Sequence, residues 1–423
     1  MKDHNKPLTT ESYKGVRDFY PEDMAIQRYI FDVWSVTAES YGYERYDASI
    51  LEPSALYKSK GAENEEMVNE QTYTFTDRGN REVTLRPEMT PTVARMIAGK
   101  RRELAFPVRW YSIPNLFRYE RPQKGRLREH YQLNCDMFGA DHFSSDVEII
   151  ALAYDMIVNF GADPKMFEIR INDRKEMTAL YESIGITDTD VQTKIMRIND
   201  KFRKIEKDEY KNAVMEVLND KELVKKVYSL VSGEGVPISK NPVVEGLITL
   251  DITNVKIDRS LARGFDYYTG TIFEIFDVSG ENNRSMLGGG RYDNLTSLFG
   301  GEAIVGIGFG MGDVTMRDFL ITHDLLTSNI TAPTLMILPT EANFNIEAQK
   351  IAQAFRKAEM SVAVDISNKK VGKKISDASD AFVSYVLVLG EDEIKSKIYI
   401  LKNLEEKSQV SGTLAELIEK IAS

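Results

Sequence analysis

The sequence is short of cysteine, with Cys135 as the only one in 423 residues. One thiol cannot close an intramolecular disulfide, and it leaves cysteine-based zinc sites without partners. The histidines are also too scattered for the local spacing of metal ligands; they are His4, His130, His142 and His323. We therefore expect a reduced, cytoplasmic setting and no structural metal.

Long hydrophobic runs are absent as well. The stretch from Ala381 to Leu389 is among the longest, whereas a membrane span needs about 20 apolar residues. The opening residues MKDHNKPLTT lack the apolar centre of an export signal. We expect an unexported, soluble protein with no membrane partner.

Positive charge is in deficit, because 54 lysines and arginines face 65 acidic residues and leave a net charge of −11. The averaged field repels polyanions, so any nucleic-acid partner must bind a local basic surface. Internal repeats and low-complexity tracts are also missing, which argues against solenoids and propellers.

What the sequence does contain is enough material for more than one domain. A single core stops growing near about 250 to 300 residues, and this chain is longer, with 42% hydrophobic and 28% charged residues. These fractions are typical of globular proteins and exclude a disordered chain. We expect two or three folded units.

The pattern of the first part of the chain predicts a helix followed by strands. Apolar residues from Pro21 to Tyr41 have helical spacing, and Gly42 ends the pattern. Strand-like segments follow at Tyr43–Leu51, Gln71–Thr76, Glu82–Leu85, Val108–Tyr119, His130–Phe138 and Phe167–Asn172. Because these strands are expected to follow one another without intervening helices, we predict an α+β domain with a central antiparallel sheet over residues 1–326.

The rest of this domain is predicted to contain a charged helical insertion, at about 174–245. Strand character returns at Ile248–Ile252 and Thr271–Val278, and the glycine-rich Gly306–Gly312 leads into a helix from about Asp313 to His323. After a linker at 327–332, strands and helices alternate over 333–423, which predicts an α/β domain with a mostly parallel sheet. Its segments are Leu335–Leu338, Ile346–Ala358, Val362–Asp365, Lys369–Ala378 and Val383–Leu389.

A basic loop between two predicted strands is the densest group of potential anion ligands. It carries five cations, Arg118, Arg121, Lys124, Arg126 and Arg128. Arginine forks match phosphate oxygens in pairs of hydrogen bonds, so the loop fits a polyphosphate site. A solvated basic surface is the alternative.

Several ordered motifs accompany this loop. They are Gly15–Phe19 with Pro21, Tyr41–Tyr43, Leu51–Pro53, Thr84–Thr90, Arg118–Arg128, Leu261–Tyr268 and Gly289–Asp293. With these motifs the chain resembles the histidyl-tRNA synthetases, a family of class II aminoacyl-tRNA synthetases, along nearly its full length. The resemblance implies a homodimer that joins L-histidine to histidine tRNA through a histidyl adenylate, using ATP and Mg²⁺.

The resemblance also implies roles for the arginines. Joining an amino acid to ATP brings two anions together, so cations must neutralise the charge that builds on the phosphoryl oxygens. Arg118 is expected to bind the α-phosphate, Arg126 the outer phosphates, and Arg263 both the α-phosphate and the histidine carboxylate. A salt bridge from Arg263 to Asp266 or Glu274 is the alternative. The implied ATP site comprises Arg118, Glu120, Arg126, His130 and Arg317.

For the amino acid, the family pattern assigns the ammonium group to Glu88, Thr90 and Gln132. Glu88 and Thr90 also fit an ordinary helix start. The ring is assigned to Asp136, Tyr268 and Tyr292, with Tyr267 beside them. Because side chains alternate along a strand, we predict that Tyr268 faces the pocket and Tyr267 packs in the core.

Three positions depart from the family pattern. His130 stands where an aromatic residue stacks on adenine, and Asp136 where bacterial members usually carry glutamate. Thr315 stands where the third class II motif has an arginine, and Arg317 is two residues further on, about 200° around a helix. Arg317 is therefore a candidate replacement only if the helix starts later; a surface arginine paired with Asp313 or Asp318 is the alternative.

Contacts with tRNA are implied in both predicted domains. Gln123 and Arg128 match positions that read the acceptor end, and the C-terminal domain resembles an anticodon-binding domain. Its lysines are a candidate phosphate-contacting stripe or a solvated face; they are Lys369, Lys370, Lys373 and Lys374. The rival function is a non-catalytic histidine-binding relative, of the type that regulates ATP phosphoribosyltransferase.

Overall fold

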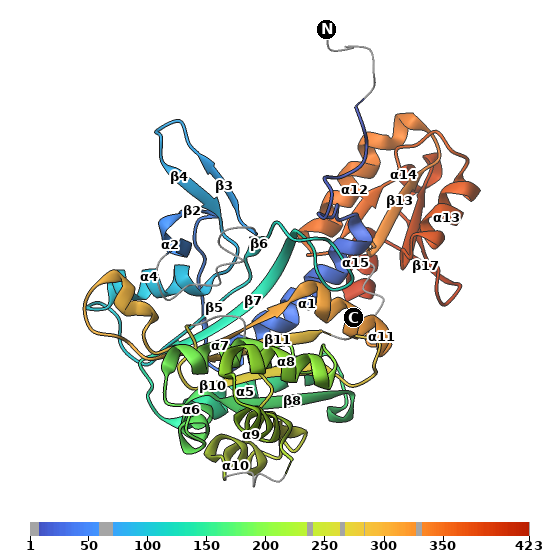
Figure 1. The fold of residues 1–423 in the computed structure, drawn as a ribbon. Helices are drawn as coiled ribbons and strands as arrows, with labels where there is room; N and C mark the ends of the chain where they lie inside the picture. Colours follow the sequence, from blue (N-terminus) through green and yellow to red (C-terminus); the bar gives the residue numbers. More distant parts are fainter. Residues whose placement is uncertain are drawn as a thin grey trace. The chain divides into compact units, whose positions relative to one another are not determined.

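The computed structural model describes residues 8–58, 71–234, 240–262, 267–282, 284–326 and 332–422. The chain divides into two compact units, Met1–Thr327 and Ser328–Ser423 (Figure 1). Across the described ranges, no helix is both long and apolar enough to cross a membrane.

A large sheet forms the centre of the first unit. Its strands, in spatial order, are β1 (Glu44–Arg45), β5 (Val108–Ser112), β7 (Glu129–Phe138), β12 (Gly306–Gly312), β11 (Ser285–Arg291), β10 (Thr271–Asp277), β8 (Phe167–Asp173) and β9 (Val255–Ile257), and β6 (Asn115–Phe117) pairs with β7. Neighbours from β5 to β8 are antiparallel, whereas β1–β5 and β8–β9 are parallel. The sheet is therefore mixed, and the predicted antiparallel arrangement holds for its central strands.

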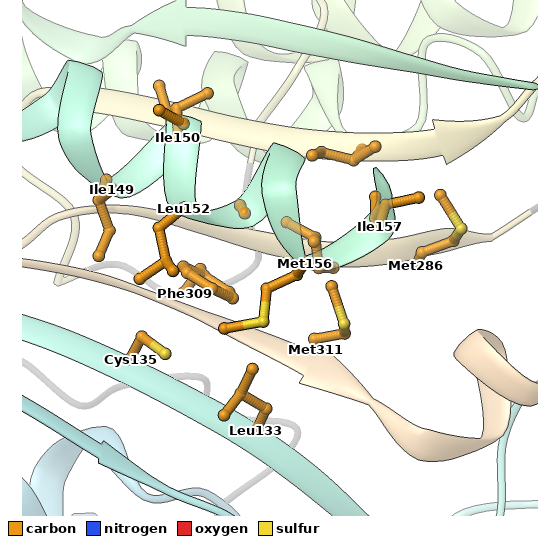
Figure 2. Close-up of a cluster of buried hydrophobic side chains, with 14 of the residues drawn as sticks. Leu133, Cys135, Ile149, Ile150, Leu152, Met156, Ile157, Met286, Phe309 and Met311 are labelled. Atoms are coloured by element: carbon orange, nitrogen blue, oxygen red, sulfur yellow. The ribbon is translucent and has the colours of Figure 1, made fainter. Parts of the chain in front are cut away.

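Helices α1 (Pro21–Ser40), α5 (Phe143–Val158) and α11 (Asp313–Thr322) pack with this sheet in one core. Figure 2 shows Leu152 and Met156 of α5 directed toward Phe309 and Met311 of β12. The prediction of strand after strand without helices is wrong here, because α5 and α4 (Thr90–Lys100) lie between predicted strands. Helix α5 is apolar on most of its surface, so its sequence shows little helical periodicity.

A small sheet lies beside the large one and contains β2 (Leu51–Pro53), β4 (Glu82–Leu85) and β3 (Tyr73–Thr76), next to the short helix α2 (Ala55–Lys58). The predicted long strand Tyr43–Leu51 is instead interrupted between β1 and β2. The predicted strand Val108–Tyr119 is likewise divided into β5 and β6.

The region after β8 is helical, with α6 (Arg174–Ser183), α7 (Thr189–Asn199), α8 (Lys207–Leu218), α9 (Lys221–Ser232) and α10 (Pro242–Thr249). Helices α6 to α9 share a separate core that includes Tyr181, Ile195, Tyr210 and Val227. The predicted strand Ile248–Ile252 is wrong, because α10 continues to Thr249 and the strand β9 begins at Val255.

The second unit is built on the sheet order β14 (Val362–Val364), β13 (Leu335–Pro339), β15 (Tyr385–Leu389), β16 (Tyr399–Asn403) and β17 (Ser408–Gly412). Its helices are α12 (Asn345–Lys357), α13 (Val371–Asp380), α14 (Glu391–Ser396) and α15 (Leu414–Ala422). The pairs β13–β14 and β13–β15 are parallel, but β15–β16 and β16–β17 are antiparallel. The sheet is thus mixed rather than mostly parallel, because β16 and β17 form a hairpin that the sequence patterns did not indicate. Short 3-10 helices occupy Pro164–Met166, Leu295–Phe299 and Ala342–Phe344.

Candidate active site

A small pocket lies over the middle of the large sheet, and strand β7 supplies part of its floor. Gln132 and Asn134 line it. Asp136 lies two residues further along β7, so it is on the same face of the strand. Asn134 was missed by sequence reasoning, although its place two residues from both Gln132 and Asp136 was a usable signal.

Glycines on the neighbouring strands β11 and β12 make room for these side chains. Gly308 is paired with Asp136 and Gly310 with Asn134. A Cβ atom added to Gly308 would collide with the Asp136 carboxylate and lie 2.9 Å from the Tyr292 hydroxyl, and one added to Gly310 would collide with the Gln132 amide. The glycine-rich motifs therefore leave the space in which the polar groups of the site meet.

Asp136 and Tyr292 form a buried pair at the end of the pocket. The Tyr292 hydroxyl donates a hydrogen bond to Asp136 Oδ1. Burial raises the pKa of Asp136 and the bond from Tyr292 offsets part of this rise, which leaves the pKa at about 7. Asp136 Oδ2 has no hydrogen-bond partner among the described residues. Tyr292 lines the pocket itself, whereas Asp136 reaches it through Tyr292.

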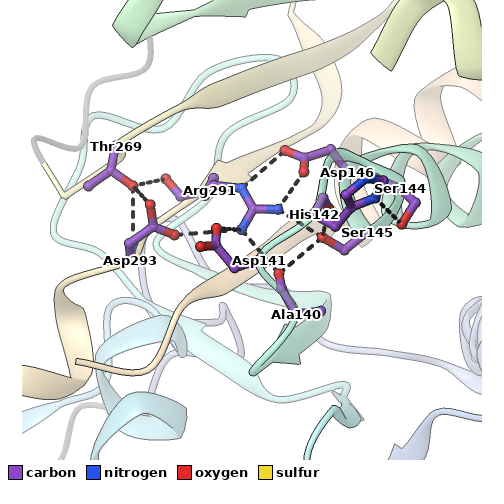
Figure 3. Close-up of polar contacts among 9 residues, drawn as sticks. All are labelled: Ala140, Asp141, His142, Ser144, Ser145, Asp146, Thr269, Arg291 and Asp293. Atoms are coloured by element: carbon purple, nitrogen blue, oxygen red, sulfur yellow. Dashed lines mark hydrogen bonds and ion pairs between the residues drawn. The ribbon is translucent and has the colours of Figure 1, made fainter. Parts of the chain in front are cut away.

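Buried ion pairs hold the backbone next to Tyr292 in place (Figure 3). Arg291 binds Asp146 at the start of α5, donates to Ser145 Oγ at 2.8 Å and to the carbonyl oxygen of Ala140 at 3.2 Å. Asp293 accepts a 2.9 Å bond from Thr269, the residue after Tyr268. Arg291 and Asp293 thus hold Tyr292 in position, and the bond between Asp293 and Thr269 also positions Tyr268.

Tyr267 and Tyr268 both line the pocket, with ring centroids 4.9 Å apart. The prediction that they face opposite ways is wrong, because they lie before β10 in irregular backbone, where strand alternation does not apply. The Tyr267 hydroxyl donates to Glu88 Oε2 at 3.3 Å.

Glu88 and Thr90 are at the opposite wall of the pocket. Glu88 is buried, and Thr90 is the first residue of α4. The two interpretations of this segment are therefore compatible, because Glu88 and Thr90 lie at a helix start and also line the pocket. A buried carboxylate that faces a pocket is suited to an ammonium group.

Arg118 lies where this pocket meets a much larger cavity of about 1430 Å³, and it lines both. Its Nε donates to the carbonyl oxygen of Pro87 at 2.9 Å, which orients the guanidinium group. Among the described residues it makes no other hydrogen bond, so its remaining N–H groups are available to a ligand. Gln132 also lines both spaces.

The large cavity contains Glu120, Arg126 and His130. Arg126 pairs with the buried Glu120 carboxylate at 2.6 Å. Burial, together with the charges of Arg118, Arg17 and Arg126, lowers the pKa of His130 to about 3. His130 is therefore a neutral ring at physiological pH, as stacking on an uncharged base requires.

The structure does not bring Arg317 to this cavity. Its guanidinium pairs with Asp23 of α1 at 2.8 Å, so its partner is an aspartate other than the neighbours considered from the sequence. Thr315 lines the cavity instead, and Asp313 pairs with Arg17 at 2.6 Å. Arg284, which sequence reasoning missed, is one of several cationic residues that line this cavity. Arg263 lies outside the described residues.

Of the predicted tRNA contacts, Gln123 is exposed on the basic loop. Arg128 is engaged within the protein. It donates to the carbonyl oxygen of Glu120 at 3.1 Å, and its guanidinium lies 4.1 Å from the centre of the Tyr119 ring.

The predicted lysine stripe is only partly on the surface of the second unit. Lys369 and Lys373 pair with Asp377, each at 2.7 Å, and Lys370 is exposed. Lys374 does not belong to the stripe, because it is buried and donates to the carbonyl oxygens of Pro339 and Asp365, both at 3.0 Å. One residue after Lys373, it lies about 100° around the helix and faces the sheet.

Comparison with known proteins identifies the family of each part of the chain. Residues 15–313 match the family model of histidyl-tRNA synthetase, and residues 334–423 match that of an anticodon-binding domain. The chain is 43% identical over 429 residues to a histidine–tRNA ligase from Leptospira biflexa serovar Patoc, covering 98% of each chain.

Two solved structures share the fold. One is a histidyl-tRNA synthetase from Nostoc sp. PCC 7120, with a TM-score of 0.80, 22% identity and coverage of 98% of this chain and 99% of that one. The other, from Bacillus halodurans C, is described as an ATP phosphoribosyltransferase regulatory subunit/histidyl-tRNA synthetase; its TM-score is 0.71 at 22% identity, with 88% and 97% of the chains covered. By its sequence matches over nearly the whole chain, this protein belongs to the histidyl-tRNA synthetase family.

Proposed function

We infer that the protein attaches L-histidine to histidine tRNA in two steps. In the first, the histidine carboxylate attacks the α-phosphorus of ATP, the bond to the bridging oxygen breaks, and pyrophosphate leaves. In the second, the terminal ribose hydroxyl of the tRNA takes the histidyl group and AMP is released. Positioning and charge neutralisation carry both steps.

The observation that carries this proposal is the position of Arg118 between two spaces of different chemistry. The small pocket offers Glu88 for an ammonium group and the Asp136–Tyr292 pair for an imidazole ring. The large cavity offers Arg126 and the neutral His130 for a nucleotide. The carboxylate of a histidine bound in the small pocket and the α-phosphate of an ATP bound in the large cavity would both lie at Arg118.

Specificity for histidine is proposed to come from Tyr292. Its hydroxyl hydrogen is used by Asp136, so the oxygen can accept a hydrogen bond from an imidazole N–H. An amino acid without that donor leaves the buried oxygen unsatisfied, which is the kind of mismatch that discriminates strongly.

Mg²⁺ fits the same cavity. Among the described residues, no group of three or more His, Cys, Asp or Glu side chains could hold a metal ion. However, Mg²⁺ commonly binds one or two carboxylates together with substrate phosphates. Glu274 lines the large cavity and would be a protein ligand, whereas the Glu120 carboxylate is bound by Arg126. When bound, the ion would neutralise charge on the outer phosphates.

Three further parts of the proposal concern partners and location. The match to an anticodon-binding domain supports tRNA binding by the second unit. Leu51 and Phe75, exposed by 45% and 48% on the small sheet, support a homodimer that would cover them. The buried single cysteine is compatible with the reducing cytoplasm. Analytical ultracentrifugation tests the dimer.

The function is tested by exchange of labelled pyrophosphate into ATP, screened over the common amino acids. Exchange with histidine alone is expected. Exchange with no amino acid would favour the regulatory rival, which the anticodon-binding match at residues 334–423 already disfavours. Exchange with another amino acid would correct the substrate.

A further inference from the structure

The position at which the family pattern has an arginine on α11 is filled here by Thr315, which offers no charge. The Thr315 hydroxyl donates at 3.1 Å to the carbonyl oxygens of Met286 or Gly312 and lines the large cavity. Arg317 is held by Asp23 and does not line that cavity. The large cavity therefore lacks the arginine that the family pattern places on α11.

Arg284 supplies a guanidinium group to the same place. It directly precedes β11, and the bond from Thr315 to Met286 joins the start of α11 to the start of that strand. A Cβ atom added to Gly125 of the basic loop would lie 3.1 Å from Arg284 Cδ and 3.6 Å from Thr315 Cγ2. Arg284 thus runs beneath the loop and beside Thr315.

The charges around Arg284 are unbalanced. It is half-buried, and it has no hydrogen bond or ion pair with another described residue. The nearby Glu120 carboxylate is already bound by Arg126 at 2.6 Å. Burial lowers the pKa of Arg284, the charge of Arg126 lowers it further, and Glu120 raises it in part. Arg126 and Arg284 both lie near the Glu120 carboxylate, which is bound among the described residues only by Arg126, so the guanidinium group of Arg284 is suited to an added anion.

We propose that Arg284 binds the outer phosphates of ATP and takes the place of the arginine missing at position 315. This role rests on the proposed function and assigns one of its substrate contacts. Arg118 lies at the junction with the amino-acid pocket, whereas Arg126 and Arg284 line only the large cavity. Arg284 therefore stabilises the charge that pyrophosphate gains when the bond from the α-phosphorus breaks and its electron pair departs with the leaving group.

Equilibrium binding separates this role from the overall reaction. Inorganic pyrophosphate and AMP are titrated, each with Mg²⁺, into the full-length wild-type protein and Arg284→Gln. We expect the substitution to weaken pyrophosphate binding about 10- to 100-fold, as for one charge-assisted contact. AMP, which has only the α-phosphate, should bind with unchanged affinity.

Rescue tests the replacement directly. Adding Thr315→Arg to Arg284→Gln should restore most of the pyrophosphate affinity, and Arg284→Lys should retain part of it. Arg81→Gln, at an arginine whose side chain is 79% exposed and paired with Asp77, is the matched control and should change neither affinity.

Three results would overturn the assignment: unchanged pyrophosphate binding by Arg284→Gln, an equal loss of AMP binding, or failure of Thr315→Arg to rescue a folded double variant. Because neither titration requires histidine, loss of the amino-acid specificity claimed above would leave these outcomes readable. The exchange assay on the wild-type protein tests that claim separately.

Discussion

The Tyr292 hydroxyl donates a hydrogen bond to the Asp136 carboxylate at the closed end of the small pocket, and both side chains are buried. Glycines opposite them on β12 leave no side chain to fill the space. A carboxyl group placed in this setting is expensive to ionise, because it exchanges water for a single hydrogen bond. Four predictions follow from this site and its supports.

Asp136 should make the stability of the unliganded protein depend on pH. Its folded-state pKa is raised to about 7, against about 3.9 when unfolded. The folded state therefore holds more protons between these values, and stability falls as pH rises from about 4 to about 7 and is then level. Thermal melting of wild type and Asp136→Asn tests this: the melting temperature of wild type minus that of the variant should decline as pH rises across this range. A difference that rises with pH would contradict the assignment.

Gly308→Ala should destabilise the protein and close the pocket. The added methyl group meets the Asp136 carboxylate and lies 2.6 Å from the carbonyl oxygen of Cys135. Overpacking of this kind costs about 1–3 kcal/mol, and histidine-dependent exchange should be lost. Gly99→Ala is the control, since that helical position has no atom within 4 Å of the added Cβ. It should gain about 0.5–1 kcal/mol. Melting temperatures of both variants test the contrast.

Asp146→Asn should be strongly destabilising, because it leaves the buried Arg291 without its main counter-charge. Removing one partner of a buried ion pair costs about 3–5 kcal/mol. Lys225→Ala breaks an exposed ion pair with Glu222, in which the two side chains are 69% and 74% accessible. It should lower the free energy of unfolding by less than about 1 kcal/mol. Similar melting temperatures for the two variants would mean that Arg291 does not anchor the Tyr292 segment.

Arg118→Lys should reduce histidine-dependent exchange about 100- to 1000-fold, the effect of losing a preorganised donor to developing charge. Lysine keeps the positive charge but loses the fork that can hold a carboxylate and a phosphate together. The bond to Pro87 would also be lost, so the charge is less well oriented. Arg81→Lys is the control for the assay. A fall smaller than about threefold would remove Arg118 from the reaction centre.

Much of this site could be predicted because its residues belong to short ordered motifs. Tyr292 lies in such a motif, whereas Gln132 and Asp136 were assigned from the family pattern outside the motifs. The structure brings all three to one place. Asn134 could have been added from alternation along β7 alone. The tyrosine pair failed because the prediction assumed a strand, whereas the backbone at Tyr267 is a turn.

Contacts between distant segments were beyond reach of the sequence patterns. Arg317 pairs with Asp23, which is 294 residues away, and no local pattern encodes that partner. Arg284 sits in a segment with no motif, and its position depends on how β11 meets α11. Helix α5 was missed because it is buried on several sides, and the hairpin β16–β17 because β17 is largely exposed and polar.

The central claim is that Arg118 joins the histidine pocket to the nucleotide cavity. A crystal structure with histidine and a non-hydrolysable ATP analogue measures this most directly. Arg118 should donate hydrogen bonds to both the histidine carboxylate and an α-phosphate oxygen, with the imidazole N–H on Tyr292. An Arg118 side chain bound to Pro87 alone, with both ligands ordered elsewhere, would contradict it.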